Sequence, residues 1–191
     1  CGWASGTGEE PYFYDFIWQR VANQRELDTG PAIDHTTESN AGYFMKFEAL
    51  NRKSGDRAGL RSPPYPVPNG VLGKKCFQFW YHMHGKDVAS LSIGITPSLK
   101  QRRTLFTRIG NHGNHWWQGR LEIATNDFQP NDRSGNFTII VEGVRGVSDK
   151  SDLAIDDAGV FDGPCAAEAT CDFEKDQCGF SNVYELNDLA W

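Results

Sequence analysis

The sequence predicts an all-β protein, a jelly-roll β-sandwich built from two antiparallel sheets. Hydrophobic residues alternate with polar ones in many short runs, and clusters of Gly, Pro, Asn and Asp separate these runs. No window repeats its hydrophobic residues every 3.6 positions, as an amphipathic helix would. Many short strands without helices are typical of a two-layer sandwich.

The clearest strand is predicted around residues 76–84, where every second side chain is hydrophobic. In that run Phe77, Phe79, Tyr81 and Met83 share one face, which is therefore expected to point into the core. The segments 61–70 and 128–136 are expected as crossovers and turns, because proline has no amide hydrogen for a sheet ladder. Three other runs alternate like the first and place these residues on one side: Leu91, Ile93 and Ile95; Trp117, Leu121 and Ile123; Phe137, Ile139 and Val141. Trp117 is expected either to fill the core or to cover a sheet face.

Length and composition indicate one folded domain together with a fragment of another. The chain has 191 residues, and a single domain is expected to take about 160–170 of them. The formal net charge of −6 argues against nucleic acid as a partner, because phosphate binding needs a basic surface. No apolar run approaches the ~18–20 residues of a membrane span, so this segment is not expected to insert into a membrane.

The end of the chain repeats its beginning. Cys178-Gly179-Phe180 corresponds to Cys1-Gly2-Trp3, and a polar stretch follows each copy. The later copy also shows what precedes this phrase, namely Cys171-Asp172-Phe173-Glu174, which the first copy lacks. We therefore expect a chain cut from a longer array of repeats.

The cysteines indicate a disulfide framework in an oxidising compartment. Their number is odd, and none forms a CxxC pair or a Cys/His zinc motif: Cys1, Cys76, Cys165, Cys171 and Cys178. If Cys171 pairs with Cys178 inside the second copy, Cys1 must pair with an upstream cysteine that is not in this chain. That leaves Cys76 to pair with Cys165, a bond that stabilises a fold by roughly 4–5 kcal/mol at most in the chain-entropy model. The N-glycosylation sequon at Asn136 agrees with secretion.

Phrases along the whole chain resemble the MAM domain, an extracellular module of meprins, neuropilins and receptor tyrosine phosphatases. They include, in order, "CGW", "FIWQRV", "TGPAIDHTT", "GYFMKFEA", "CFQFWYHMHGKDVASLSIGI", "NFTIIVEGVRG" and "SDLAIDDAGVFDGPC". By this resemblance residues 1–165 are a MAM domain without its first strand, residues 166–170 are a short linker, and residues 171–191 begin a second MAM domain. The family joins its first cysteine to its second and its third to its fourth, which agrees with the pairing above.

The resemblance also implies a structural cation, usually calcium in this family. The matching residues are Asp34 in "DHTT", the pair Asp156 and Asp157, and Glu174 in the second copy. Calcium takes several oxygen ligands, and carboxylates from separate segments repel one another without it. Strand alternation predicts that only one of the Asp pair faces the core. The alternative is that these Asp residues cap turns and accept backbone hydrogen bonds.

The sequence contains no catalytic motif, so the chain is not expected to be an enzyme. It has no GxSxG phrase, no Gly-rich phosphate loop before a helix, and no Cys/His nucleophile beyond the disulfide cysteines. The histidines His82, His84, His112 and His115 lack the HExxH order of a zinc-binding helix and are expected to be packed, hydrogen-bonded side chains. Arg145 is expected to form a structural ion pair or to bind backbone carbonyl groups.

The function expected from the resemblance is that of a non-catalytic adhesion or assembly module. The parent would be a multi-domain extracellular protein, either secreted or membrane-anchored, and possible partners are other proteins, neighbouring MAM repeats or a second copy of the chain. The alternative is a carbohydrate-binding jelly roll, because such folds often stack sugars on exposed indole rings. Trp116 is the candidate for that role, since it must point away from Trp117 and from the core.

Overall fold

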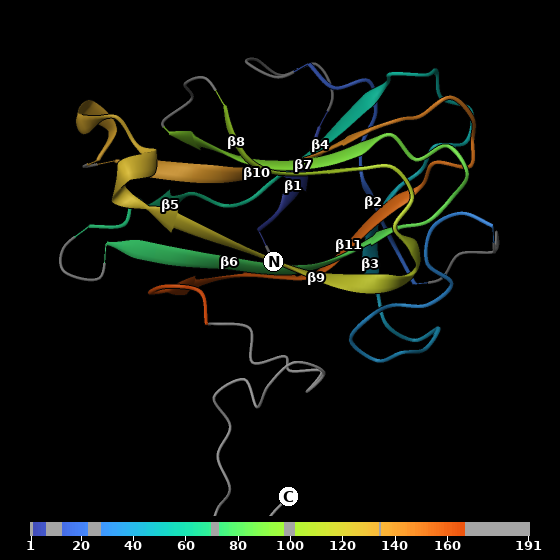
Figure 1. Ribbon diagram of the computed structural model, residues 1–191, viewed down its shortest axis with the longest axis horizontal. Helices are drawn as coiled ribbons and strands as arrows, with labels where there is room; N and C mark the ends of the chain where they lie inside the picture. Colours follow the sequence, from blue (N-terminus) through green and yellow to red (C-terminus); the bar gives the residue numbers. More distant parts are fainter. Residues whose placement is uncertain are drawn as a thin grey trace, which may run out of the picture.

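The computed structural model describes residues 2–6, 13–22, 28–69, 73–97, 102–133 and 135–166, which form a sandwich of two antiparallel sheets (Figure 1). In the first sheet the strand order is β1 (Ala4–Ser5), β4 (Arg57–Arg61), β10 (Asn136–Val144), β7 (Ser90–Pro97) and β8 (Arg103–Ile109), with β5 (Tyr65–Pro66) beside β10. In the second sheet it is β2 (Gln19–Val21), β3 (Phe44–Phe47), β11 (Leu153–Asp162), β6 (Lys74–Met83) and β9 (Gly113–Ala124). Two 3-10 turns, η1 (Thr125–Asp127) and η2 (Pro130–Asp132), connect β9 to β10. The predicted all-β jelly-roll fold is confirmed.

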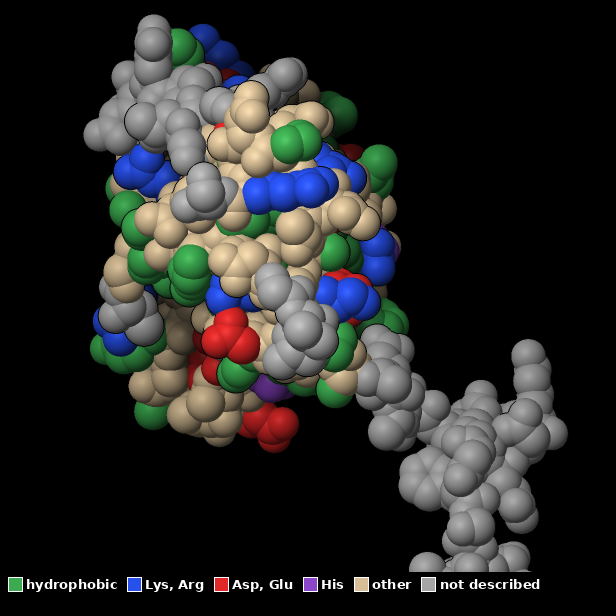
Figure 2. Space-filling model, turned by 90° about the vertical axis from the view of Figure 1, so that its left-hand side faces the viewer, with side chains coloured by type: hydrophobic (Ala, Val, Ile, Leu, Met, Phe, Trp, Pro, Cys, Tyr) green, Lys and Arg blue, Asp and Glu red, His purple; other side chains and the backbone are tan. Residues whose placement is uncertain are grey.

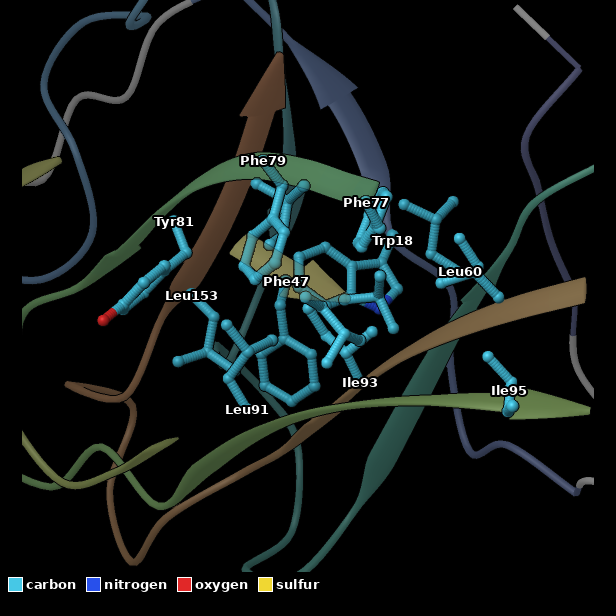
Figure 3. Close-up of a cluster of buried hydrophobic side chains, with 14 of the residues drawn as sticks. Trp18, Phe47, Leu60, Phe77, Phe79, Tyr81, Leu91, Ile93, Ile95 and Leu153 are labelled. Carbon is cyan, nitrogen blue, oxygen red and sulfur yellow. The ribbon is translucent and has the colours of Figure 1, made fainter. Parts of the chain in front are cut away.

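The core lies between the two sheets and consists of the inward faces that alternation predicted (Figure 3). Phe77 and Phe79 of β6 are fully buried, as are Ile93 of β7 and Ile139 of β10. Their burial removes a large apolar area from water, which is the main force that holds the two sheets together.

An aromatic group centred on Phe47 closes one part of this core. The Phe47 ring lies 4.6 Å from the ring of Phe16 and 5.6 Å from that of Trp18, measured between centroids. Opposite it, Gly143 of β10 leaves room for the ring, because a Cβ atom there would overlap Phe47. One early segment and the strands β3 and β10 thus meet around a single phenyl ring.

Trp117 covers the face of β9 instead of filling the core, the second of the two alternatives that the sequence left open. Its side chain keeps 41% of its surface exposed, whereas Leu121 and Ile123 of the same strand are buried. Trp117 lies near the start of an edge strand, where its ring packs 4.1 Å from His115 and its Nε1 donates to the carbonyl of His112 at 3.0 Å. Alternation gives the correct side of the strand here, but the core does not extend that far.

One disulfide and one hydrogen bond fix the end of the described chain. The expected disulfide between Cys76 on β6 and Cys165 after β11 is present, with 4.8 Å between the Cα atoms. The Arg120 side chain on β9 then donates from Nη1 to the carbonyl of Ala166 at 3.1 Å. The expected partners of Cys1, and the expected Cys171–Cys178 bond, lie outside the described residues.

Arg145 binds backbone carbonyl groups, as its position in "VEGVRG" predicts. Its buried guanidinium donates from Nε to the carbonyl of Ala49 at 3.0 Å, and from Nη1 to those of Gly146 at 3.2 Å and Val147 at 3.0 Å. The guanidinium therefore binds two carbonyl groups of the loop between β10 and β11 and connects that loop to Ala49, which follows β3.

The surface of the sandwich carries charges of both signs. Figure 2 shows the end of the sandwich where β6 begins, on which basic and acidic side chains lie among hydrophobic and uncharged ones. Among the segments that the structure describes, no helix has the length and apolar character needed to cross a bilayer.

Replacing Phe47 by alanine is expected to lower the free energy of unfolding by about 3–5 kcal/mol, because it empties a fully buried aromatic site. Urea unfolding followed by tryptophan fluorescence measures the change. Phe13→Ala is the matched control, since Phe13 is 61% exposed, and it should cost less than about 0.5 kcal/mol. Equal decreases in the free energy of unfolding of the two variants would contradict this description of the core.

Candidate functional site

Three of the four predicted cation ligands lie together beside β11. Asp34 belongs to the loop that precedes β3, and Asp156 and Asp157 lie in the middle of β11. Hydrogen bonds to residues 35–37 connect all three, and we call them the carboxylate cluster. The fourth predicted ligand, Glu174, lies outside the described residues.

Asp34 organises its own loop from a fully buried position. Its Oδ2 accepts from the Thr37 amide at 2.8 Å, and its Oδ1 accepts from the Thr37 hydroxyl at 2.7 Å and the Ser39 amide at 3.3 Å. This is the local turn that Asp side chains favour, in which the carboxylate binds the amide three residues later. Gly42 is needed beside it, because a Cβ atom at that position would overlap the carboxylate.

Both residues of the Asp pair are hydrogen-bonded to the same loop, with Asp156 half-buried and Asp157 exposed. Asp156 pairs with Trp80 and Gly159 with Gln78, so β11 contains one residue more than β6 at this point. A β-bulge of this kind interrupts alternation. Asp157 has the left-handed backbone angle φ of 48°, which turns its side chain toward the loop as well.

The bulge brings each carboxylate to a donor in residues 35–36. Asp156 Oδ2 accepts from the His35 amide at 3.0 Å, and its Oδ1 accepts from the Asp157 amide at 2.9 Å. Asp157 Oδ2 lies 2.7 Å from His35 Nδ1, and Oδ1 accepts from the Thr36 hydroxyl at 2.7 Å. The pair therefore fastens the loop to the middle of β11.

The pKa shifts of two of these carboxyl groups have opposite signs. Burial raises the pKa of Asp34, but the hydrogen bonds from Thr37 and Ser39 outweigh it and leave that pKa below its ordinary value. Burial also raises the pKa of Asp156, and the charges of Asp157 and Asp34 add to the rise, although the amides of His35 and Asp157 oppose it. The three carboxylates are thus close enough to repel one another.

The carboxylate cluster does not by itself form a calcium site. Its oxygens are of the type that calcium binds, yet each of the six accepts or lies within hydrogen-bond distance of a protein donor. Within the described ranges, no group of three or more His, Cys, Asp or Glu side chains is arranged to hold a metal ion. These hydrogen bonds agree with the alternative interpretation, in which the Asp residues cap turns and accept backbone hydrogen bonds. Calcium binding stays a prediction, and it requires a further oxygen ligand.

A pocket of about 630 Å³ lies against the outer face of β6 and β9. His35 stacks on Trp80 with 3.7 Å between the ring centroids, so one face of that indole is covered. Trp116 is half-buried, and its Nε1 donates to the carbonyl of Ile33 at 3.1 Å. His82 also lines this pocket and is buried, and its Nε2 lies 3.1 Å from Asn114 Oδ1. Burial lowers the pKa of His82 to about 4, so this histidine is neutral at physiological pH.

A second pocket, of about 580 Å³, opens between the edges of the two sheets. We call it the seam groove. Trp3 and Leu60 line it from the first sheet, and Tyr43 and Ile155 line it from the second. Tyr43 is 49% exposed, and the Arg20 guanidinium lies 3.5 Å from the centre of its ring. The groove reaches Asp156 and Asp157, so it adjoins the carboxylate cluster.

Sequence reasoning identified the three Asp residues but missed the groups that hold them. His35, Thr36 and Thr37 supply most of the donors, and Gly42 supplies the space. The spacing Asp-x-x-Thr in "DHTT" is the local signal that predicts such a turn. Nothing local marks Gly42 or the seam groove, because both depend on segments that meet only in the fold.

Comparison with known proteins places these features in a family. The model of the MAM domain, meprin/A5/mu, matches residues 1–166. The chain is 33% identical to MAM domain-containing protein 2 of Mus musculus over 190 residues, covering 99% of the chain and 23% of that protein. It is 35% identical to thyroid hormone-induced protein B of Xenopus laevis over 152 residues, 78% of the chain and 20% of that protein. It is 36% identical to MAM domain-containing glycosylphosphatidylinositol anchor protein 1 of Gallus gallus over 160 residues, 80% of the chain and 15% of that protein.

The chain thus spans less than a quarter of the length of these relatives. Among solved structures it is similar to a cleaved adhesin domain of Lys-gingipain from Porphyromonas gingivalis, with a TM-score of 0.55 and 9% identity over 85% of this chain and 91% of the other. It is also similar to TmCBM61, solved with β-1,4-galactotriose, with a TM-score of 0.50 and 15% identity over 84% and 88% of the two chains. At such low identity the likeness shows the fold alone.

Replacing Asp34 by asparagine is expected to destabilise the protein at pH 7 and much less at low pH. The lowered pKa of Asp34 means that its charged form stabilises the fold above the ordinary value of 3.8, and that this contribution disappears as the pH falls through the folded-state pKa. Urea unfolding at pH 7 and pH 3 measures the difference between variant and wild type. Glu38→Gln, at an exposed position of the same loop, is the control and should follow the wild type. If the variant and the wild type differ as much in free energy of unfolding at pH 3 as at pH 7, a role for the charge of Asp34 is contradicted.

Proposed function

Because the chain belongs to the MAM domain family, we propose that it is a non-catalytic adhesion or assembly module of a larger extracellular protein, and that it acts by binding other proteins. Relatives that carry a glycosylphosphatidylinositol anchor in their names support a place at the cell surface. The Cys76–Cys165 disulfide supports an oxidising compartment. The parent protein is secreted or held at the membrane by a part outside this segment.

The family match over residues 1–166 carries the proposal, and the seam groove offers a surface for it. A surface hollow lined by Trp3, Tyr43 and Ile155 combines apolar area with a rigid frame, because the sheets on both sides are fixed by the core. Aromatic residues in such hollows are the typical anchors of protein–protein contacts. The Tyr43 ring is accessible there, and its hydroxyl adds a polar group to the rim.

Carbohydrate binding has less support from the site. A sugar needs a free indole face on which to stack, whereas Trp80 is stacked against His35 and Trp116 is hydrogen-bonded within the fold. Among the tryptophans that the structure describes, Trp117 has the exposed indole. The experiment below therefore distinguishes sugar binding from protein binding.

The sequon supports the extracellular assignment. Asn136 is the first residue of β10 and is exposed, so an attached glycan would extend into solvent. Glycosylation of Asn136 stays a prediction.

Beads coated with the folded chain are expected to bind cell surfaces through proteins. Prior treatment of the cells with protease should abolish binding, whereas treatment with glycosidases or addition of free sugars should leave it unchanged. Tyr43→Ala should weaken binding about tenfold, because it removes a buried aromatic contact, and Trp117→Ala should have no effect. Binding that survives protease but is lost with glycosidase, or with Trp117→Ala, would instead establish the carbohydrate-binding function.

Chelation tests the proposed calcium ion. If calcium joins the carboxylate cluster to a further ligand, EDTA should lower the melting temperature by on the order of 5 °C, because a ligand that binds only the folded state stabilises it. Differential scanning calorimetry with and without added calcium measures the shift, and magnesium serves as the control ion. An unchanged melting temperature would mean that the hydrogen bonds from residues 35–39 hold the cluster without a cation.

A further inference from the structure

The pocket of about 630 Å³ on the outer face of β6 and β9 has a rigid frame, and we call it the aromatic pocket. Trp80 of β6 and Trp116 of β9 form one side of it, and the loop at residues 31–38 forms the other. The loop is fastened to both rings, because His35 stacks on Trp80 at 3.7 Å between centroids and the carbonyl of Ile33 accepts from Trp116 Nε1 at 3.1 Å. A pocket that is already formed loses little conformational entropy when a ligand enters it.

The charge that lines the aromatic pocket is negative. Glu38 and Asp34 line it, whereas none of the lining residues is Lys or Arg. Asp34 is already satisfied by hydrogen bonds from Thr37 and Ser39. Glu38 is exposed, and within the described segments its carboxylate has no hydrogen bond or ion pair. The pocket therefore offers one free carboxylate to a cation.

A second acceptor in the aromatic pocket is also unsatisfied. His82 is 1% exposed, and burial lowers its pKa to about 4, so its ring is neutral at physiological pH. Its Nε2 lies 3.1 Å from Asn114 Oδ1, and since a carbonyl oxygen can only accept, Nε2 carries the hydrogen and Nδ1 a lone pair. Nδ1 is buried and has no hydrogen-bond partner in the part of the chain that the structure describes. A buried acceptor without a donor is costly, which favours a ligand that brings N–H groups.

A guanidinium group has the properties that these groups require. It is positively charged, it has several N–H donors and no acceptor, and its flat shape stacks on aromatic rings. Trp116 is half-buried, so part of its ring remains open to the pocket. The ammonium group of lysine has the charge but not the flat shape, and a sugar hydroxyl has no charge for Glu38. Arginine is also the charged residue most enriched at the centres of protein–protein contacts.

We infer that the aromatic pocket binds the guanidinium group of an arginine on a partner protein, with Glu38 as its counter-ion and the Trp116 ring beside it. This rests on the proposed protein-binding function and adds a second contact surface to the seam groove. The seam groove supplies apolar area, whereas the aromatic pocket selects partners by one charged side chain.

Titration of the full, isotope-labelled chain with N-acetyl-arginine methylamide tests this site by NMR. The indole N–H signal of Trp116 should shift and saturate. The citrulline analogue replaces the guanidinium by a neutral urea group of the same shape, and it should bind at least about fivefold more weakly, because its hydrogen bonds lack the charge.

Two variants separate the charge from the fold. Glu38→Gln should raise the dissociation constant of the arginine analogue about threefold, the effect of one exposed ion pair. Glu122→Gln is the matched control and should leave it unchanged, because the Glu122 carboxylate lies on β9 2.7 Å from Lys74 and does not line the pocket. Both positions are on the surface, and the two variants should unfold at the same urea concentration as the wild type.

Three results would each overturn the inference: no saturable shift of the Trp116 signal, equal affinities for the arginine and citrulline analogues, or equal effects of the two Glu substitutions. None of them affects the binding of beads through Tyr43, so the proposed function can stand when this site fails. Conversely, beads that fail to bind cells would reject the proposed function while the titration still reports on the pocket.

Discussion

The antiparallel pairing of β11 with both β3 and β6 is the constraint on which the rest of the structure depends. Within the described residues, the early strands β2 and β3 join the middle strands β6 and β9 only through β11, which comes last in the chain. The sheet therefore closes only when its most distant parts have met, and contacts of this range are slow to form. The Cys76–Cys165 disulfide fastens the far end of the same strand and shortens the loop that must close.

The irregularity of β11 explains why the carboxylate cluster and the seam groove lie side by side. Up to Ile155 the strand is regular and paired on both edges, and its inward side chains fill the core. The extra residue after Asp156 turns two carboxylates toward the loop at residues 34–37, to which both are hydrogen-bonded. A single bulge thus ends the regular part of β11 and places the carboxylate cluster next to the seam groove.

Local patterns predicted most of the fold, because the burial of Phe77 or Ile139 depends on which face of its own strand it occupies. They did not predict the exposure of Trp117, since Leu121 and Ile123 share its face of β9 and are buried. Alternation also gave no sign that both Asp residues bond to one loop, because a bulge leaves no mark in a period-2 pattern. The carboxylate cluster was predicted by family resemblance, while the seam groove was not predicted at all. A groove is formed where pairing partners are absent, and segments that are far apart in the sequence line it.

Native-state hydrogen exchange tests the central role of β11 most directly. The account predicts that the amides of Ala154 and Ile155 exchange only when the whole domain unfolds, so that their free energy of opening equals the free energy of unfolding measured in urea. Amides of Ile139 and Val141 in the first sheet should give the same value, since neither sheet persists without the other. Faster exchange in β11, while β10 keeps its full protection, would show that the domain stays folded when this strand opens, and would contradict the account.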